Sequence, residues 1–125
     1  SGYVDDLGSG RGKIWLNAIN QFLENPIFGS GIEEKNSKYI AHNAVIEAFN
    51  STGIFGGIIF VIILINSFKN AVYLIKIKSQ TSFISFLFLS ILFLSFLSSS
   101  LYSPQIWFLI LLLISAKSYE INSRY

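Results

Sequence analysis

The 125-residue sequence lacks cysteine and contains a single histidine, His42. Disulfide bonds and thiolate metal sites are therefore excluded, and a lone histidine argues against a zinc centre. Charged residues make up only 13% of the chain, about half the share that is usual in soluble domains. The formal net charge is only +2 and the basic residues are scattered, which argues against a nucleic-acid-binding protein.

Charge is missing altogether from one long stretch. Between Lys78 and Lys117 there is no Asp, Glu, Lys, Arg or His, and 52% of the whole chain is hydrophobic. The core of a soluble protein of this size does not need so long an uncharged run. The composition, with a mean hydropathy of +0.56, indicates an integral membrane protein.

Three apolar segments approach the roughly 20 residues that a membrane-spanning helix needs. A triplet of serines from Ser98 and the later Pro104 mark a reversal between the second and third segments, because they are the only breaks in the uncharged stretch. We expect spans at about residues 54–70, 82–98 and 101–116.

Basic residues predict the orientation of these spans, because cytoplasmic loops are enriched in Lys and Arg. Three of them lie around the connection between the first two spans and two follow the third: Lys69, Lys76, Lys78, Lys117 and Arg124. Residues 1–51 would then be external, residues 52–116 would hold the spans, and residues 117–125 would form a cytoplasmic tail. We expect a multi-pass protein of the plasma or inner membrane, in contact with the lipid bilayer.

The external segment is predicted to contain an amphipathic helix from Gly12 to Glu24. Its apolar residues recur at helical spacing: Ile14, Trp15, Ala18, Ile19, Phe22 and Leu23. Such a helix can lie flat on the bilayer or pack on other loops. Pro26 ends it, and a glycine-rich turn follows. The predicted fold class is therefore all-α: an external amphipathic segment followed by three transmembrane helices.

Polar residues gather where the external segment meets the first span. His42 can exchange a proton near neutral pH, although it can also cap a helix or stand on a surface. Asn43, Glu47 and Asn50 share one face of a predicted helix, at spacings of four and three. A polar stripe on an apolar helix must face a wet cavity, another polar helix or a ligand. The glycines from Gly53 onward indicate close backbone packing.

Arg11 stands at the start of the predicted amphipathic helix. A guanidinium group and a helix N-terminus can together bind a phosphate, whereas the alternative is an ordinary interfacial arginine. The glycines around Arg11 do not form a Walker motif, since Leu7 and Ile14 occupy the positions that need glycine and Ser or Thr.

Four elements follow one another in order between residues 11 and 57: Arg11 with Trp15, then Asn25-Pro26-Ile27-Phe28-Gly29-Ser30-Gly31, then His42-Asn43, then Thr52-Gly53-Ile54-Phe55-Gly56. Together they resemble the large external loop and following helix of the O-antigen ligase and polymerase family. These membrane enzymes move glycans off a polyprenyl diphosphate carrier. The later helices match the family only in hydropathy. The family has many more spans, and the chain begins with Ser1, so we expect it to be the C-terminal part of a longer protein.

The resemblance implies a glycosyltransferase that needs no metal and no cofactor. A hydroxyl of a glycan acceptor would attack an oligosaccharide donor linked to polyprenyl diphosphate. Arg11 matches the candidate that contacts the diphosphate, and His42 matches the histidine that acts as base or positions the acceptor. Trp15, Asn43 and Glu47 would line the acceptor site.

Two other interpretations remain open at this stage. A non-catalytic remnant or assembly subunit would explain the short chain. A fragment of a polysaccharide transporter would explain the polar stripe, but transporters more often carry ionisable groups at mid-membrane, and the second and third predicted spans hold none. The sequence does not distinguish polymerase from ligase, nor does it identify the sugar, the acceptor or the stereochemistry of the linkage.

Overall fold

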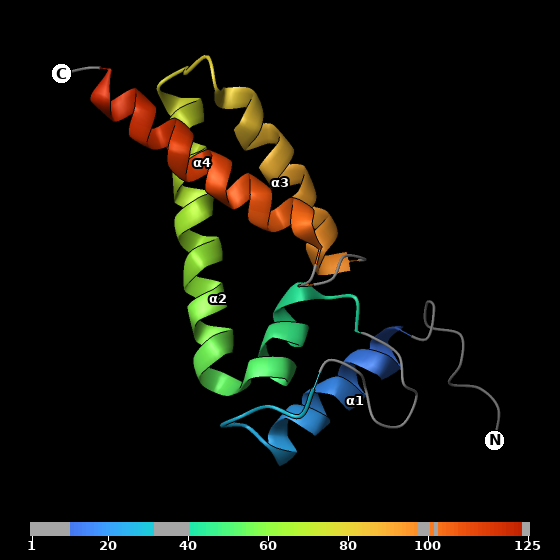
Figure 1. Ribbon diagram of the computed structural model, residues 1–125. Coiled ribbons are helices and arrows are strands. Elements are labelled where there is room, and N and C mark those ends of the chain that lie inside the picture. The colour runs from blue at the N-terminus through green and yellow to red at the C-terminus, as the bar shows by residue number, and fades with distance from the viewer. Residues whose placement is uncertain (1–10, 32–40, 98–100, 102, 124–125) are drawn as a thin grey trace.

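The computed structural model describes residues 11–31, 41–97, 101 and 103–123. The described residues form four helices and no strand (Figure 1). The helices are α1 (Arg11–Glu24), α2 (Ala44–Lys76), α3 (Ser82–Leu97) and α4 (Pro104–Asn122). The all-α fold class predicted from the sequence is confirmed.

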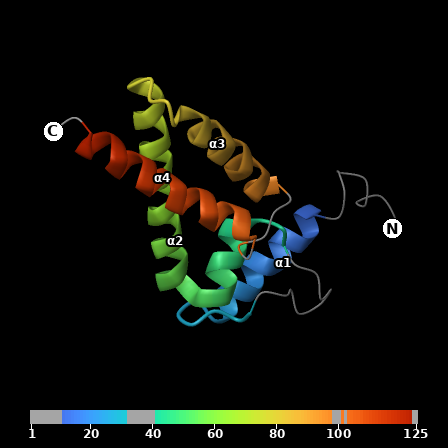
Figure 2. The ribbon, with the colours of Figure 1, turned by 45° about the horizontal axis from the view of Figure 1, so that its top comes forward.

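The helix α1 packs against the beginning of α2 and not against α3 or α4 (Figures 1 and 2). Its packed face holds Ala18 and Gln21, which are 1% and 4% exposed. The ring of Phe22 on the same face meets Phe49 of α2 edge to face, with centroids 5.6 Å apart. The amphipathic helix is confirmed, but its buried face is narrower than predicted. The polar Gln21 takes part in the packing, whereas the apolar Ile19 and Leu23 are exposed.

The helix α2 is bent sharply at Gly53 (Figure 1). The glycine has φ 71° and ψ −169°, a conformation that essentially only glycine adopts. A short arm, residues 44–52, precedes the bend, and a long arm, residues 54–76, follows it. At 1.5 Å per residue the long arm measures about 34 Å, close to the roughly 30 Å of a bilayer's hydrocarbon core. It runs past the expected end of the first span because Ala71 and Leu74 are fully buried in the core.

The long arm of α2, α3 and α4 form the main body of the molecule. A short connection returns α3 antiparallel to α2, and α4 crosses both (Figures 1 and 2). The core residues are mostly branched or aromatic, with alanines where helices approach closely: Ala44, Ala48, Phe60, Leu64, Ala71, Leu74, Ile84, Phe88, Leu101, Ile106, Leu109, Ile110, Leu113 and Ala116. The buried Ser67, Ser85 and Ser95 also keep helix surfaces small, which favours close packing.

The helices differ in how well they meet the requirements of a membrane span. Among the described helices, α2 alone is long and apolar enough to cross a membrane by length and composition. The apolar α3 has only 16 residues, and α4 has 19 but ends in a polar segment that includes Lys117 and Glu120. The expected second and third spans therefore coincide with helices that do not meet this criterion individually.

Candidate functional site at the bend of alpha 2

The loop of residues 25–31 is hydrogen-bonded to the bend of α2. In a straight helix the carbonyl of Asn50 would accept from the amide of Ile54, four residues later. The bend breaks that bond, and the loop supplies new partners for the carbonyl of Asn50 and the amide of Ile54. Ile54 N donates to Pro26 O at 2.8 Å, and the amides of Ser30 and Gly31 donate to Asn50 O at 2.6 and 3.2 Å. The bend and the loop therefore complete each other's backbone hydrogen bonding.

Two glycines make this close approach possible. A Cβ atom on Gly53 would overlap the carbonyl of Ile27, and one on Gly29 would overlap the carbonyl of Asn50. Both glycines also have positive φ, 71° and 78°. The close backbone packing predicted at Gly53 is confirmed, and its partner is the loop that precedes it by about 25 residues. Ser30 adds a bond from its hydroxyl to the carbonyl of Gln21 in α1, at 3.2 Å.

Asn43 is the N-cap of α2. Its side-chain oxygen accepts from the amides of Val45 and Ile46 at 3.1 and 3.2 Å, satisfying two donors that a helix N-terminus leaves without partners. Its Nδ2 donates to the carbonyl of Phe96 at 3.0 Å, near the end of α3. The side chain is thus engaged by the protein's own backbone and joins α2 to α3.

Trp15 fixes the segment just before α2. Its indole Nε1 donates to the carbonyl of Ala41 at 2.7 Å, which connects α1 to the residue that precedes His42. Ala41 itself is buried, at 5% exposure. With the N-cap Asn43 on the other side, the backbone is therefore held on both sides of the histidine.

His42 lies between these two fixed residues and is exposed. Its φ is 50°, in the left-handed region that few residues other than glycine adopt but in which histidine is enriched. Its neighbours Ala41 and Asn43 are both buried. The local backbone thus presents one ionisable side chain to the solvent at the start of the short arm.

Glu47 is completely buried, at 0% exposure. Its Oε2 accepts from the amide of Leu101 at 2.8 Å, and the carbonyl of Leu101 accepts from the Trp107 indole at 2.8 Å. The carboxylate therefore joins the short arm of α2 to the start of α4. Trp107 also packs on Phe60, with ring centroids 5.6 Å apart. Trp107 was not predicted from the sequence as a functional residue, and no motif near it indicates that it bonds to Leu101.

The three members of the polar stripe are all buried. Asn43, Glu47 and Asn50 are 8%, 0% and 1% exposed. The side chains of Asn43 and Glu47 are hydrogen-bonded to backbone groups. The Asn50 side-chain oxygen has no hydrogen-bond partner within the described part of the chain. A separate apolar cavity of about 170 Å³ is lined by Ala48, Thr52, Gly56, Ile59, Phe60, Ile63, Leu101 and Trp107.

Arg11 is the first residue of α1, as the sequence predicted, but its side chain lies outside what the structure describes. Within residues 11–31, 41–97, 101 and 103–123, no three His, Asp or Glu side chains come together in a way that could hold a metal ion.

The chain matches no protein-family model, no curated protein and no solved structure. The resemblance to the O-antigen ligase and polymerase family therefore rests on the sequence elements alone.

The buried carboxylate allows the first prediction. Glu47→Ala should destabilise the protein by about 2 kcal/mol or more, because the amide of Leu101 loses its buried acceptor. Glu47→Gln keeps an acceptor oxygen and should cost less than half as much. Thermal unfolding in detergent micelles, followed by circular dichroism, measures both. If alanine and glutamine destabilised equally, the hydrogen bond to Leu101 would not be the main contribution of Glu47.

Proposed function

We propose that this chain is the C-terminal part of a membrane glycosyltransferase that polymerises or ligates surface polysaccharide. The donor would be an oligosaccharide on polyprenyl diphosphate, and the nucleophile a hydroxyl of a glycan acceptor. One observation carries the proposal. The elements of the resemblance make contact in two places: residues 25–31 hydrogen-bond to Asn50 and Ile54 at the bend of α2, and Trp15 hydrogen-bonds to Ala41, next to the exposed His42 at the start of the short arm.

We assign distinct tasks to the candidate residues. His42 is the group available to take a proton from the acceptor hydroxyl or to orient it. Arg11, at the N-terminus of α1, would contact the diphosphate, where a planar guanidinium offers paired donors. The hydrogen bonds of Trp15, Asn43 and Glu47 to backbone groups favour positioning over direct contact with the acceptor.

A bilayer around α2, α3 and α4 is part of the proposal. Large apolar side chains on these helices point outward with exposures of 62–67%: Phe55, Phe83, Phe93, Phe108 and Leu111. Exposed apolar side chains of this size and number need lipid or protein to cover them. The helices would cross as three spans, with the bend of α2 on the external side and the basic connection between α2 and α3 in the cytoplasm.

The exposed face of α1 fits the same arrangement. Leu16, Ile19 and Leu23 lie on one side of the helix and are 60%, 45% and 64% exposed, and Phe28 beyond it is 86% exposed. Apolar side chains on one face of an otherwise polar helix suit a position in the plane of the membrane interface. This would place His42 at the level where a lipid-linked donor presents its diphosphate.

Glycan transfer in proteoliposomes tests the proposal. A labelled polyprenyl-diphosphate oligosaccharide and an acceptor glycan are supplied to the chain alone and to the longer protein that contains it. We expect a transferred product with the longer protein. Absence of product, with correct insertion, would favour a non-catalytic remnant or assembly subunit. Movement of the donor across the vesicle membrane without a product would favour a transporter.

The proposed topology predicts the accessibility of single cysteines, since the chain has none of its own. Asn20→Cys, on the exposed side of α1, should react with a membrane-impermeant maleimide applied outside intact cells. Gln80→Cys, exposed in the connection between α2 and α3, should react only after permeabilisation. The same response at both positions would contradict an odd number of spans between them.

A further inference from the structure

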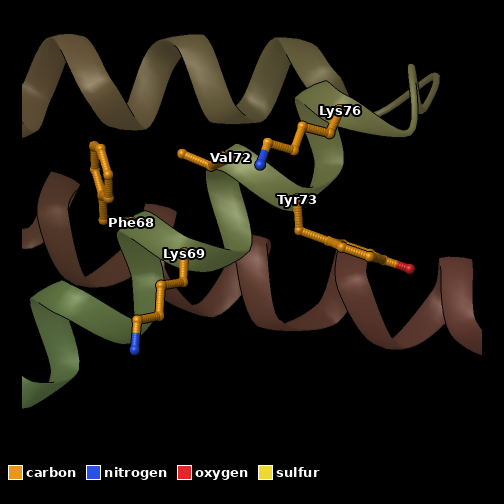
Figure 3. A pocket seen from close by; sticks show the side chains of 5 residues that line it. All are labelled: Phe68, Lys69, Val72, Tyr73 and Lys76. Carbon is orange, nitrogen blue, oxygen red and sulfur yellow. The ribbon is translucent and has the colours of Figure 1, made fainter.

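A second group of residues with binding chemistry lies at the far end of α2 from His42. There, the side chains of one helix face line a cavity of about 310 Å³ (Figure 3). The lining residues are Phe68, Lys69, Val72, Tyr73 and Lys76. Most of them follow the three- and four-residue spacing of one helix face, so one side of α2 forms the cavity wall.

This cavity combines an apolar wall with cations at its rim. Val72 and Tyr73 are half-buried and Phe68 is 47% exposed, so the wall is hydrocarbon and aromatic. Lys69 and Lys76 are exposed and stand about two helical turns apart along the axis. Figure 3 shows the Lys76 side chain running back along α2 toward Val72. Its ammonium group is thereby placed next to the apolar wall.

A third lysine strengthens the positive field at this end of the molecule. Lys117 of α4 donates to the side-chain oxygen of Asn70 at 2.8 Å, and its ammonium lies 5.6 Å from the centroid of the Tyr73 ring. Both contacts are with neutral groups, so neither neutralises the charge. From Lys69 to the C-terminus the sequence has five basic residues and one acidic residue, Glu120, which accepts a hydrogen bond from Ser79.

We propose that this pocket binds an anionic phospholipid, with the headgroup phosphate against Lys69 and Lys76 and an acyl chain along Phe68 and Val72. The proposal uses the topology of the proposed function, which places this end of α2 at the cytoplasmic surface, where anionic lipids attract basic residues. The flexible lysine stems allow either ammonium to follow a headgroup. A zwitterionic lipid offers the same phosphate and chains, but its own ammonium cancels the charge.

Native mass spectrometry of the full chain in detergent micelles tests this directly. The probes are equal amounts of phosphatidylglycerol and phosphatidylcholine with distinguishable isotopic labels and identical acyl chains. The unmodified chain should prefer phosphatidylglycerol, and Lys69→Gln/Lys76→Gln should weaken its binding by about fivefold for each lysine. Lys13→Gln/Lys78→Gln removes the same charge outside the cavity and should keep the preference. An equal loss in both double variants, or no loss in the first, would overturn the proposal.

Two further experiments distinguish binding of the whole lipid from binding of its phosphate group alone. Val72→Trp fills the cavity from its half-buried wall and should weaken both lipids while the lysines remain. Millimolar inorganic phosphate should not displace bound phosphatidylglycerol; displacement would mean that the lysines bind any phosphate and that the apolar wall contributes nothing. Glycan transfer by the intact protein should survive Lys69→Gln/Lys76→Gln. Loss of lipid preference thus stays distinguishable from failure of the proposed transfer reaction.

Discussion

Replacing His42 by glycine is expected to lower glycan transfer in the intact protein by ~100-fold to ~10,000-fold, the usual contribution of a positioned general base. Glycine is the appropriate replacement because His42 has a φ of 50°, which glycine adopts without strain. Since the side chain is exposed, its removal leaves no cavity in the core. The initial rate of transfer from a labelled lipid-linked donor measures the effect, with protein insertion verified in parallel.

His42→Asn separates proton transfer from positioning. Asparagine tolerates the left-handed region and can hydrogen-bond the acceptor, but it does not take up a proton near neutral pH. Activity that is lost with glycine and retained with asparagine would mean that His42 orients the acceptor. Activity retained in both variants would reduce His42 to a surface residue and remove it from the mechanism. Alanine is a poorer test, since a Cβ at positive φ adds backbone strain of its own.

Gly53→Ala is expected to destabilise the protein by about 3 kcal/mol or more. The glycine occupies a conformation that costs other residues of order 1–3 kcal/mol. A Cβ at this position would also overlap the carbonyl of Ile27 and push the loop of residues 25–31 off the bend. Each displaced backbone hydrogen bond adds about 1 kcal/mol. The melting temperature in micelles should therefore fall by about 10 °C.

Gly12→Ala is the matched control for this substitution. Gly12 lies in α1, where an added Cβ would have no atom within 4 Å, so alanine should leave stability unchanged or raise it by ~0.5–1 kcal/mol. Equal melting temperatures for Gly53→Ala and the unmodified protein would show that the bend relaxes at little cost. The described conformation of Gly53 would then not be required for folding.

Hydropathy and periodicity were sufficient to predict the helices, because apolar side chains at helical spacing determine which faces pack. The helix that contains the expected first span, residues 54–70, extends beyond it. The helix continues to Lys76 because the fully buried Ala71 and Leu74 pack against the other helices. A charged residue on an exposed face does not end a helix whose opposite face is still in the core.

The partners of the polar residues could not be predicted, because they are distant along the chain. The stripe that Glu47 shares with Asn43 was expected to face a wet cavity, another polar helix or a ligand, whereas Glu47 accepts from the backbone amide of Leu101, 54 residues away. The bend at Gly53 could not be predicted from the sequence either. Glycine permits such a conformation without requiring it, and only the contact with residues 25–31 selects it.

The exchange of hydrogen bonds at Asn50 and Ile54 ties the bend of α2 to the loop of residues 25–31. A straight α2 would regain the bond between these two residues, whereas the bent form trades it for three bonds to the loop of residues 25–31. The loop therefore sets the angle between the short arm, which carries His42 at its start, and the long arm. Under the proposed function, a ligand that displaced residues 25–31 would remove the bonds that replace the one between Asn50 and Ile54, and would therefore act on the direction of the short arm that carries His42.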